Sequence, residues 1–149
     1  MHIPRIALTI GALLALLVAP VASAAAPPTT VLTIDIVFDV SEEFTATGGV
    51  ICETGTAVTD PVFAAGFGRM GRGAATFHLI KTLTCDNGSG TFQIRVNAGA
   101  SPNATGTVGG FSVVAGTGDY AGLRGGGHLV GTFTDDGIVD VYQGMLTND

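Results

Sequence analysis

Only a few side chains in this 149-residue chain combine the chemistry and the setting needed to recognise a small molecule. Lys81 belongs to an alternating row with Leu79 and Leu83, an unusual place for a charged group. Its ammonium is expected either to reach the mouth of the fold along its apolar stem or to bind in a pocket. Tyr120 and Tyr142 either line that mouth or pack in the core with a satisfied hydroxyl. Lys81, Tyr120 and Tyr142 are therefore the candidate ligand-binding residues.

The other titratable side chains favour structural or surface roles. Arg95 and Asp140 alternate with apolar neighbours and are expected to face water. His78 lies between two apolar residues and should point outward, and His128 is expected in a structural or surface position. The chain contains no G-x-S-x-G elbow, no H-E-x-x-H pair and no EF-hand spacing of acidic residues. Catalytic residues are therefore not assigned, and whether the protein is an enzyme stays open.

A glycine-rich segment matches the dinucleotide-binding fingerprint in its G-x-G-x-x-A form, at Gly116-Thr117-Gly118-Asp119-Tyr120-Ala121. That fingerprint works where the glycines open a helix whose N-terminus meets a pyrophosphate. Here Arg124-Gly125-Gly126-Gly127 follows within one turn, so there is no room for the helix. We therefore expect no nicotinamide cofactor, and nothing else in the chain calls for a cofactor.

The chain holds two cysteines, Cys52 and Cys85, an even number that favours one disulfide in an exported protein. Two free thiols or half of a metal site are the alternatives. Zinc needs about four nitrogen or sulfur ligands, and only His78 and His128 could join, neither at finger-like spacing. The sequence predicts a Cys52–Cys85 disulfide and no metal site.

Residues 1–24 have the pattern of a secretory signal peptide. Arg5 supplies the positive start, an apolar run follows from Ile6 to Val18, and Ala22-Ser23-Ala24 is a cleavage site. We expect a secreted protein that has no membrane segment after cleavage. The net charge of −6 argues against nucleic acid and anionic membranes as partners, because both require a basic surface.

Alternating strands and glycine turns account for the rest of the chain, which contains 23 glycines. Residues 25–30 are expected to form an extended segment, and 31–149 a single domain. The expected strands cover residues 32–40, 44–50, 54–59, 77–85, 91–98, 110–115, 127–134 and 138–146, while 62–70 is either strand or loop. No stretch shows a helical period. About eight antiparallel strands predict an all-β barrel or sandwich.

The segment from Phe111 to Gly125 resembles the strand–turn–strand unit of the dirigent and allene oxide cyclase-like barrels. The shared features are a strand ending in Val-Val, a Gly-Thr-Gly corner, an aromatic residue, and Arg-Gly before the next strand. The corner motif comprises Gly116, Thr117, Gly118, Tyr120, Arg124 and Gly125. Tyr120 can fold back to plug the barrel end. The resemblance implies an eight-stranded antiparallel β-barrel of calycin-like shape, often trimeric.

The corner segment and the alternating strands together lead to the hypothesis of a secreted barrel that binds a small apolar molecule in its lumen. A catalytic version would steer a cyclisation or coupling without a cofactor, by holding the reactant in one conformation. The alternative is a non-catalytic extracellular oligomer with a filled barrel. Four valines on otherwise polar faces, Val37, Val113, Val139 and Val141, favour a homo-oligomer, a trimer or dimer, under either hypothesis.

Overall fold

The computed structural model describes residues 28–37, 40–65 and 74–149, with the backbone alone over 61–65. Within these residues the regular elements are β1 (Thr29–Val37), β2 (Ser41–Thr47), β3 (Thr54–Ala65), β4 (Ala75–Cys85), β5 (Thr91–Ala100), β6 (Gly106–Gly116), the 3-10 helix η1 (Gly118–Tyr120), β7 (Leu123–Phe133) and β8 (Gly137–Asn148). The expected signal peptide, 1–24, lies outside the described residues. So do residues 25–27 of the expected extended segment 25–30, of which Thr29 and Thr30 already belong to β1.

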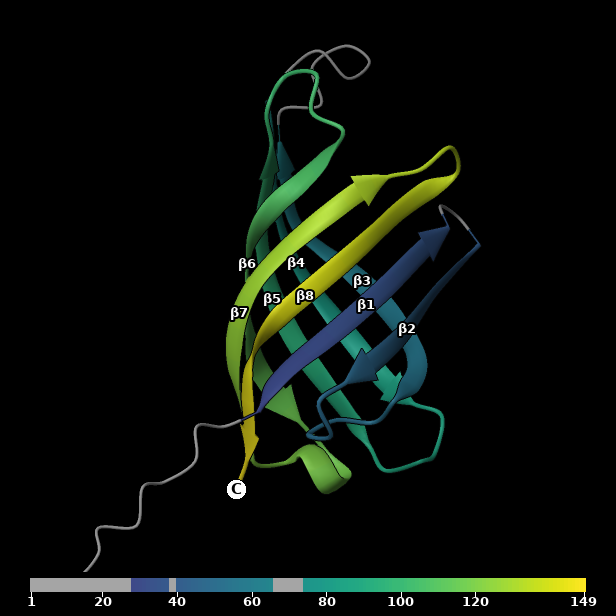
Figure 1. Ribbon diagram of the computed structural model, residues 1–149, viewed down its shortest axis with the longest axis vertical. Coiled ribbons are helices and arrows are strands. Elements are labelled where there is room, and N and C mark those ends of the chain that lie inside the picture. The colour runs from purple at the N-terminus through teal and green to yellow at the C-terminus, as the bar shows by residue number, and fades with distance from the viewer. Residues whose placement is uncertain (1–27, 38–39, 66–73) are drawn as a thin grey trace, which may run out of the picture.

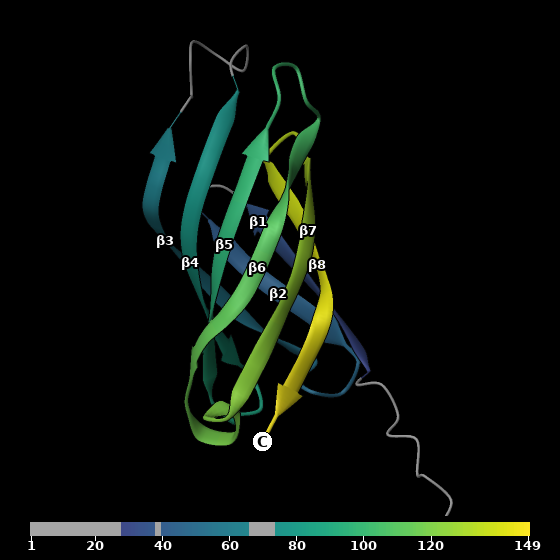
Figure 2. The same cartoon turned by 90° about the vertical axis from the view of Figure 1, so that its left-hand side faces the viewer.

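The strands form one closed antiparallel barrel (Figures 1 and 2). Each strand pairs with the next along the chain, and β1 also pairs with β8. The pairing of β1 with β8 closes the sheet, whereas β2 pairs with β3 only from Glu43 to Thr45. The predicted fold class, an all-β, eight-stranded antiparallel barrel, is confirmed.

Several strand boundaries differ from the prediction. Residues 54–59 and the start of 62–70 form one strand, β3, although Pro61 interrupts the pattern. The register shifts between Pro61 and Phe63, and such a bulge tolerates a residue without an N–H donor. β7 begins at Leu123, four residues before the prediction, because its glycine run pairs with β8. β1 and β2 each end three residues earlier than expected.

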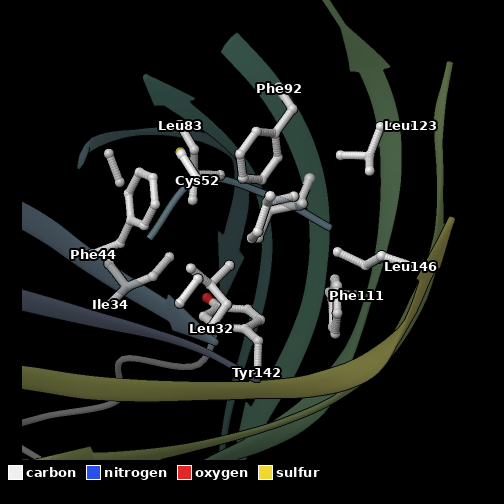
Figure 3. Packing of buried hydrophobic residues seen from close by; sticks show 14 of the residues in the cluster. Leu32, Ile34, Phe44, Cys52, Leu83, Phe92, Phe111, Leu123, Tyr142 and Leu146 are labelled. Atoms are coloured by element: carbon white, nitrogen blue, oxygen red, sulfur yellow. The ribbon is translucent and has the colours of Figure 1, made fainter. Parts of the chain in front are cut away.

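The side chains of the inward rows form an apolar core inside the barrel (Figure 3). Three aromatic contacts run through it: Phe44 to Phe92, Phe92 to Tyr120, and Phe111 to Tyr142, all edge-to-face. The ring centroids lie 5.4 to 6.2 Å apart, within the range in which such pairs attract. Alternation along each strand places these residues inside and their sequence neighbours outside.

One end of the barrel is closed by the chain itself, at the bottom of Figure 1. The predicted disulfide between Cys52 and Cys85 is confirmed, and it ties the segment after β2 to the end of β4. Tyr120 of η1 is buried against Phe92, and its hydroxyl lies 2.8 Å from the Ser89 hydroxyl. Gly118 has φ +58°, a conformation that glycine adopts without strain, so the corner can fold Tyr120 back.

Candidate binding site in the barrel lumen

A group of charged and polar side chains lies inside the otherwise apolar barrel. Lys81 of β4 is 1% exposed, so its side chain stays in the lumen and does not reach the solvent. Its Nζ donates to Glu42 Oε2 at 3.0 Å and to the Thr59 hydroxyl. The Thr59 hydroxyl in turn donates to Glu42 Oε2 at 2.7 Å. Strands β2, β3 and β4 thus each contribute one member of a closed hydrogen-bonded group.

A second polar pair comes from β8. Tyr142 is completely buried and donates its hydroxyl to Asp140 Oδ2 at 3.0 Å. Figure 3 shows Tyr142 inside the barrel with Leu32 and Phe111. Burial and the negative charge of Asp140 raise the pKa of Tyr142, so the phenol remains a neutral donor. The pair places one carboxyl group and one hydroxyl within the core.

Asp140 is 6% exposed, so the prediction that it faces water is wrong. Ile138, Asp140 and Tyr142 lie on one face of β8, and that face is the inner one. The residues between them, Val139 and Val141, are apolar too, so the sequence did not show which row faced inward. The signal that could have found the buried carboxyl is its spacing of two from Tyr142 and six from Leu146.

Burial raises the pKa of the Asp140 carboxyl above its ordinary value. The positive charge of Lys81 and the hydrogen bond from Tyr142 oppose this rise, whereas the negative charge of Glu42 adds to it. The two polar groups of the lumen are therefore coupled electrostatically. A single ammonium is shared among two carboxyl groups, and the group it contacts directly is Glu42.

A row of paired residues places Asp140 next to two further inward positions. Asp140 pairs with Gly131 of β7, and Gly131 pairs with Thr107 of β6. A Cβ atom at Gly131 would overlap both Asp140 Oδ1 and Thr107 Oγ1, so these two oxygens overhang the glycine from either side. Glycine at 131 is what allows the carboxyl and the hydroxyl to face the same point.

The structure does not bring all three candidate residues together. Lys81 and Tyr142 belong to the polar group in the lumen, and the charge of Lys81 acts on Asp140, the hydrogen-bond partner of Tyr142. Tyr120 lies at the closed end and serves as its plug, together with Thr117, whose hydroxyl contacts that of Thr91. The sequence analysis missed Glu42, Thr59, Thr107 and Asp140 as members of the site.

Tyr120 also borders a separate hollow of about 570 Å³ on the outside of the closed end. Polar groups of Glu53, Asn87, Ser89 and Asp119 line it. The hollow is open to solvent, and the hydroxyls of Ser89 and Tyr120 in it contact each other.

The two histidines with described positions lie outside this site. His78 is half-buried and forms a hydrogen bond with the side chain of Asn97, and His128 is exposed on the outer face of β7. Arg95 is exposed, as predicted. No group of three or more His, Cys, Asp or Glu side chains with the geometry of a metal site occurs among the described residues.

Comparison with known proteins adds no relative: no family model, curated protein or solved structure matches the chain. In the part of the chain that the structure describes, no helix is long and apolar enough to cross a membrane.

Proposed function

We propose that this barrel binds a small, mainly apolar molecule in its lumen and holds a polar group of that molecule at the Asp140–Tyr142 pair. The observation that carries the proposal is a carboxyl group of low exposure inside an apolar barrel, with a raised pKa. A protein core gains little stability from buried charges, and perturbed carboxyl groups are concentrated at functional sites.

The direction of access follows from the two ends of the barrel. The disulfide, Tyr120 and the 3-10 helix block one end. Glu42 and Asp140 lie near the other end, one residue from the start of β2 and three from the start of β8, and Thr59 lies midway along β3 in contact with Glu42. Glu42 is 19% exposed, so this group meets solvent on that side. The ligand therefore enters opposite the disulfide.

The first test is native mass spectrometry of the protein purified from its culture medium, followed by an amide NMR titration with cyclohexanol. We expect a retained small molecule, or saturable shifts at Tyr142 and Leu83 that Val113→Phe abolishes. Val113 packs against the core from β6, so phenylalanine there fills the lumen. Val58→Phe on the outer face of β3 is the matched control. An empty protein without saturable lumen shifts would contradict the proposal.

The second candidate function is that of an extracellular structural oligomer with a filled barrel. It is favoured by an exposed apolar row across the outer face, in which Val108, Val130 and Val141 pair in register on β6, β7 and β8. These valines are 66%, 49% and 38% exposed. Exposed apolar groups at adjoining positions are typical of subunit contacts. A dimer or trimer assembled through this row is compatible with lumen binding, so a retained ligand would decide between the two functions.

We further propose a location outside the cell and a relationship to the dirigent and allene oxide cyclase-like barrels. A disulfide in a chain with the signal pattern at 1–24 supports the location. The barrel topology supports the relationship, together with the corner motif, in which Gly116 to Tyr120 connect β6 to β7. The site geometry suits orientation of a bound molecule without a cofactor, as in the catalytic version of the hypothesis.

A further inference from the structure

One inward-facing acceptor distinguishes the lumen site from an ordinary buried polar network. Lys81, Thr59, Glu42 and the Tyr142 hydroxyl all have hydrogen-bond partners within the barrel. Asp140 Oδ1 has no hydrogen-bond partner among the described residues, and Asp140 is buried, with only 6% of its surface exposed. A buried carboxylate oxygen without a donor is costly, because it has lost the hydrogen bonds that water would supply. The site therefore lacks a donor at this oxygen.

The surroundings of Asp140 decide what kind of donor fits. Lys81 and Glu42 already form an ion pair in the lumen, and a second cation brought to Asp140 would have to lose its hydration inside an apolar barrel. A neutral hydroxyl loses much less hydration. The Thr107 hydroxyl and Asp140 Oδ1 both lie over Gly131. A ligand group placed between them can donate to Asp140 Oδ1, and its own oxygen can accept from Thr107. A ligand hydroxyl can do both, whereas a carbonyl can only accept.

We infer that the lumen ligand is a small apolar alcohol whose hydroxyl donates to Asp140 Oδ1 and accepts from Thr107. This inference rests on the proposed lumen binding and specifies its ligand class. The apolar body of the alcohol lies against the neighbouring core side chains, such as Ile34, which pairs with Asp140, and Ile138, which borders Gly131.

The test compares four molecules that share one carbon ring: cyclohexanol, cyclohexanone, cyclohexylamine and methylcyclohexane. Dissociation constants come from amide NMR titrations of the wild-type protein. We expect cyclohexanol to bind roughly tenfold or more tightly than each of the others, the usual preference of a site with an unpaired charged acceptor. Because this series uses only the wild-type chain, it does not depend on how a variant folds.

Two variants then locate the preference. Asp140→Asn keeps the shape but removes the charge, and the alcohol should lose most of its advantage over the ketone. Thr107→Val should weaken alcohol binding and leave methylcyclohexane unchanged. Asp35→Asn is the matched control, because Asp35 is exposed on β1 beside Ile34. It should leave all four constants unchanged.

The outcomes separate the two proposals. Equal affinity for all four molecules would overturn the alcohol inference and leave the lumen-binding proposal in place. It would mean that a water molecule donates the missing hydrogen bond to Asp140 Oδ1. Tighter binding of the amine or the ketone would also overturn it. Absence of binding by every ring, with no retained molecule in the native mass spectrum, would overturn lumen binding and with it the alcohol inference.

Discussion

At the residue scale, burial of the Asp140 carboxyl group lowers the stability of the fold, whereas its unpaired oxygen is the acceptor in the proposed ligand contact. A carboxyl group loses its hydration when a barrel encloses it, and here only Tyr142 restores a hydrogen bond to it. The ionised carboxyl group is therefore less favourable in the folded state than in water, and the pKa of Asp140 is raised. The buried oxygen without a donor, Oδ1, is the acceptor that a hydroxyl of the proposed ligand would use.

Asp140→Asn is expected to raise the thermal unfolding midpoint at neutral pH. Above pH 3.8 the unfolded chain releases the Asp140 proton, whereas the folded chain still holds it until its higher pKa is reached. The contribution of Asp140 to the free energy of unfolding therefore falls as the pH rises from 3.8 through the raised pKa. Asparagine does not titrate, and its carbonyl still accepts from Tyr142. The gain should appear above this window and vanish near pH 3.8.

Calorimetric scans between pH 4 and 8 of the wild type, Asp140→Asn and Asp35→Asn measure this difference. Asp35 is exposed and serves as the control for a general change of charge. A gain that is the same at every pH, or that appears equally in Asp35→Asn, would show that burial of the Asp140 charge is not its cause.

Lys81 neutralises the second carboxyl group of the lumen, and its loss should destabilise the barrel. Lys81→Met leaves Glu42 and Thr59 without their shared donor. We expect the free energy of unfolding to fall by about 2–3 kcal/mol. This loss is smaller than for a fully buried pair, because Glu42 is partly exposed. The double variant Lys81→Met/Glu42→Gln should recover a large part of it. Urea unfolding measures both. A double variant no more stable than Lys81→Met would contradict charge pairing as the reason.

At the element scale, the connections at the closed end do as much as the strands to shape the lumen. The corner after β6 carries Tyr120 back under the barrel, and the disulfide holds the segment that follows β2. The opposite end carries the polar group, so the two ends differ in chemistry as well as in packing. The two ends of a symmetric strand topology are therefore chemically different.

Tyr120→Phe tests the plug. The ring still packs on Phe92, but the contact with the Ser89 hydroxyl is lost, and we expect about 1 kcal/mol less stability, as for an ordinary hydrogen bond. Ser89→Ala should cost more, because the Ser89 hydroxyl also donates to Asn87 Oδ1, and adding Tyr120→Phe to Ser89→Ala should cost little further. Urea unfolding of the four proteins measures this coupling. Fully additive losses would mean that the two hydroxyls do not stabilise each other.

At the scale of the whole molecule, the distribution of charge on the outer surface is uneven. Across the outer faces of β6, β7 and β8 the outward side chains are mostly valine, glycine, serine and threonine, with Val108, Val130 and Val141 in one row. Arg124 lies at the start of β7 and pairs with Asp149, away from that row. Val113, which was expected on an outer face, instead packs against the core, because it follows Thr107 and Phe111 in the inward row of β6 and pairs with the buried Ile94.

Val130→Lys should dissociate the proposed oligomer. Lysine in the middle of the apolar row would place like charges opposite each other in a symmetric contact and would oppose burial of the row. Sedimentation velocity at micromolar concentration should give a dimer or trimer for the wild type and a monomer for the variant. Val58→Lys, at an exposed valine of β3, is the control and should keep the oligomer. A wild type that is monomeric throughout would overturn the oligomer proposal.

Some residues of the candidate site could be predicted from the sequence, and others could not. Lys81 stood out because its row had other apolar members, and Tyr142 because an aromatic hydroxyl suits a mouth. Asp140 was missed because both rows of β8 carry apolar residues, so period-two alternation did not select the inner one. Thr107 and Glu42 gave no local signal, since threonine and glutamate at strand ends are ordinary surface residues.

Local chemistry decided the class of fold and the covalent link. Alternating residues and turns such as Asp86 to Gly90 are properties of short segments and depend on neighbours in the chain, while the disulfide follows from an even number of cysteines. The lumen site depends on registers instead: Lys81 meets Glu42 across 39 residues, and Asp140 shares Gly131 with Thr107 from another strand. Only closure of the barrel brings these strands together and removes the water around them. The buried carboxyl group, its raised pKa and its unpaired oxygen are therefore products of the tertiary structure.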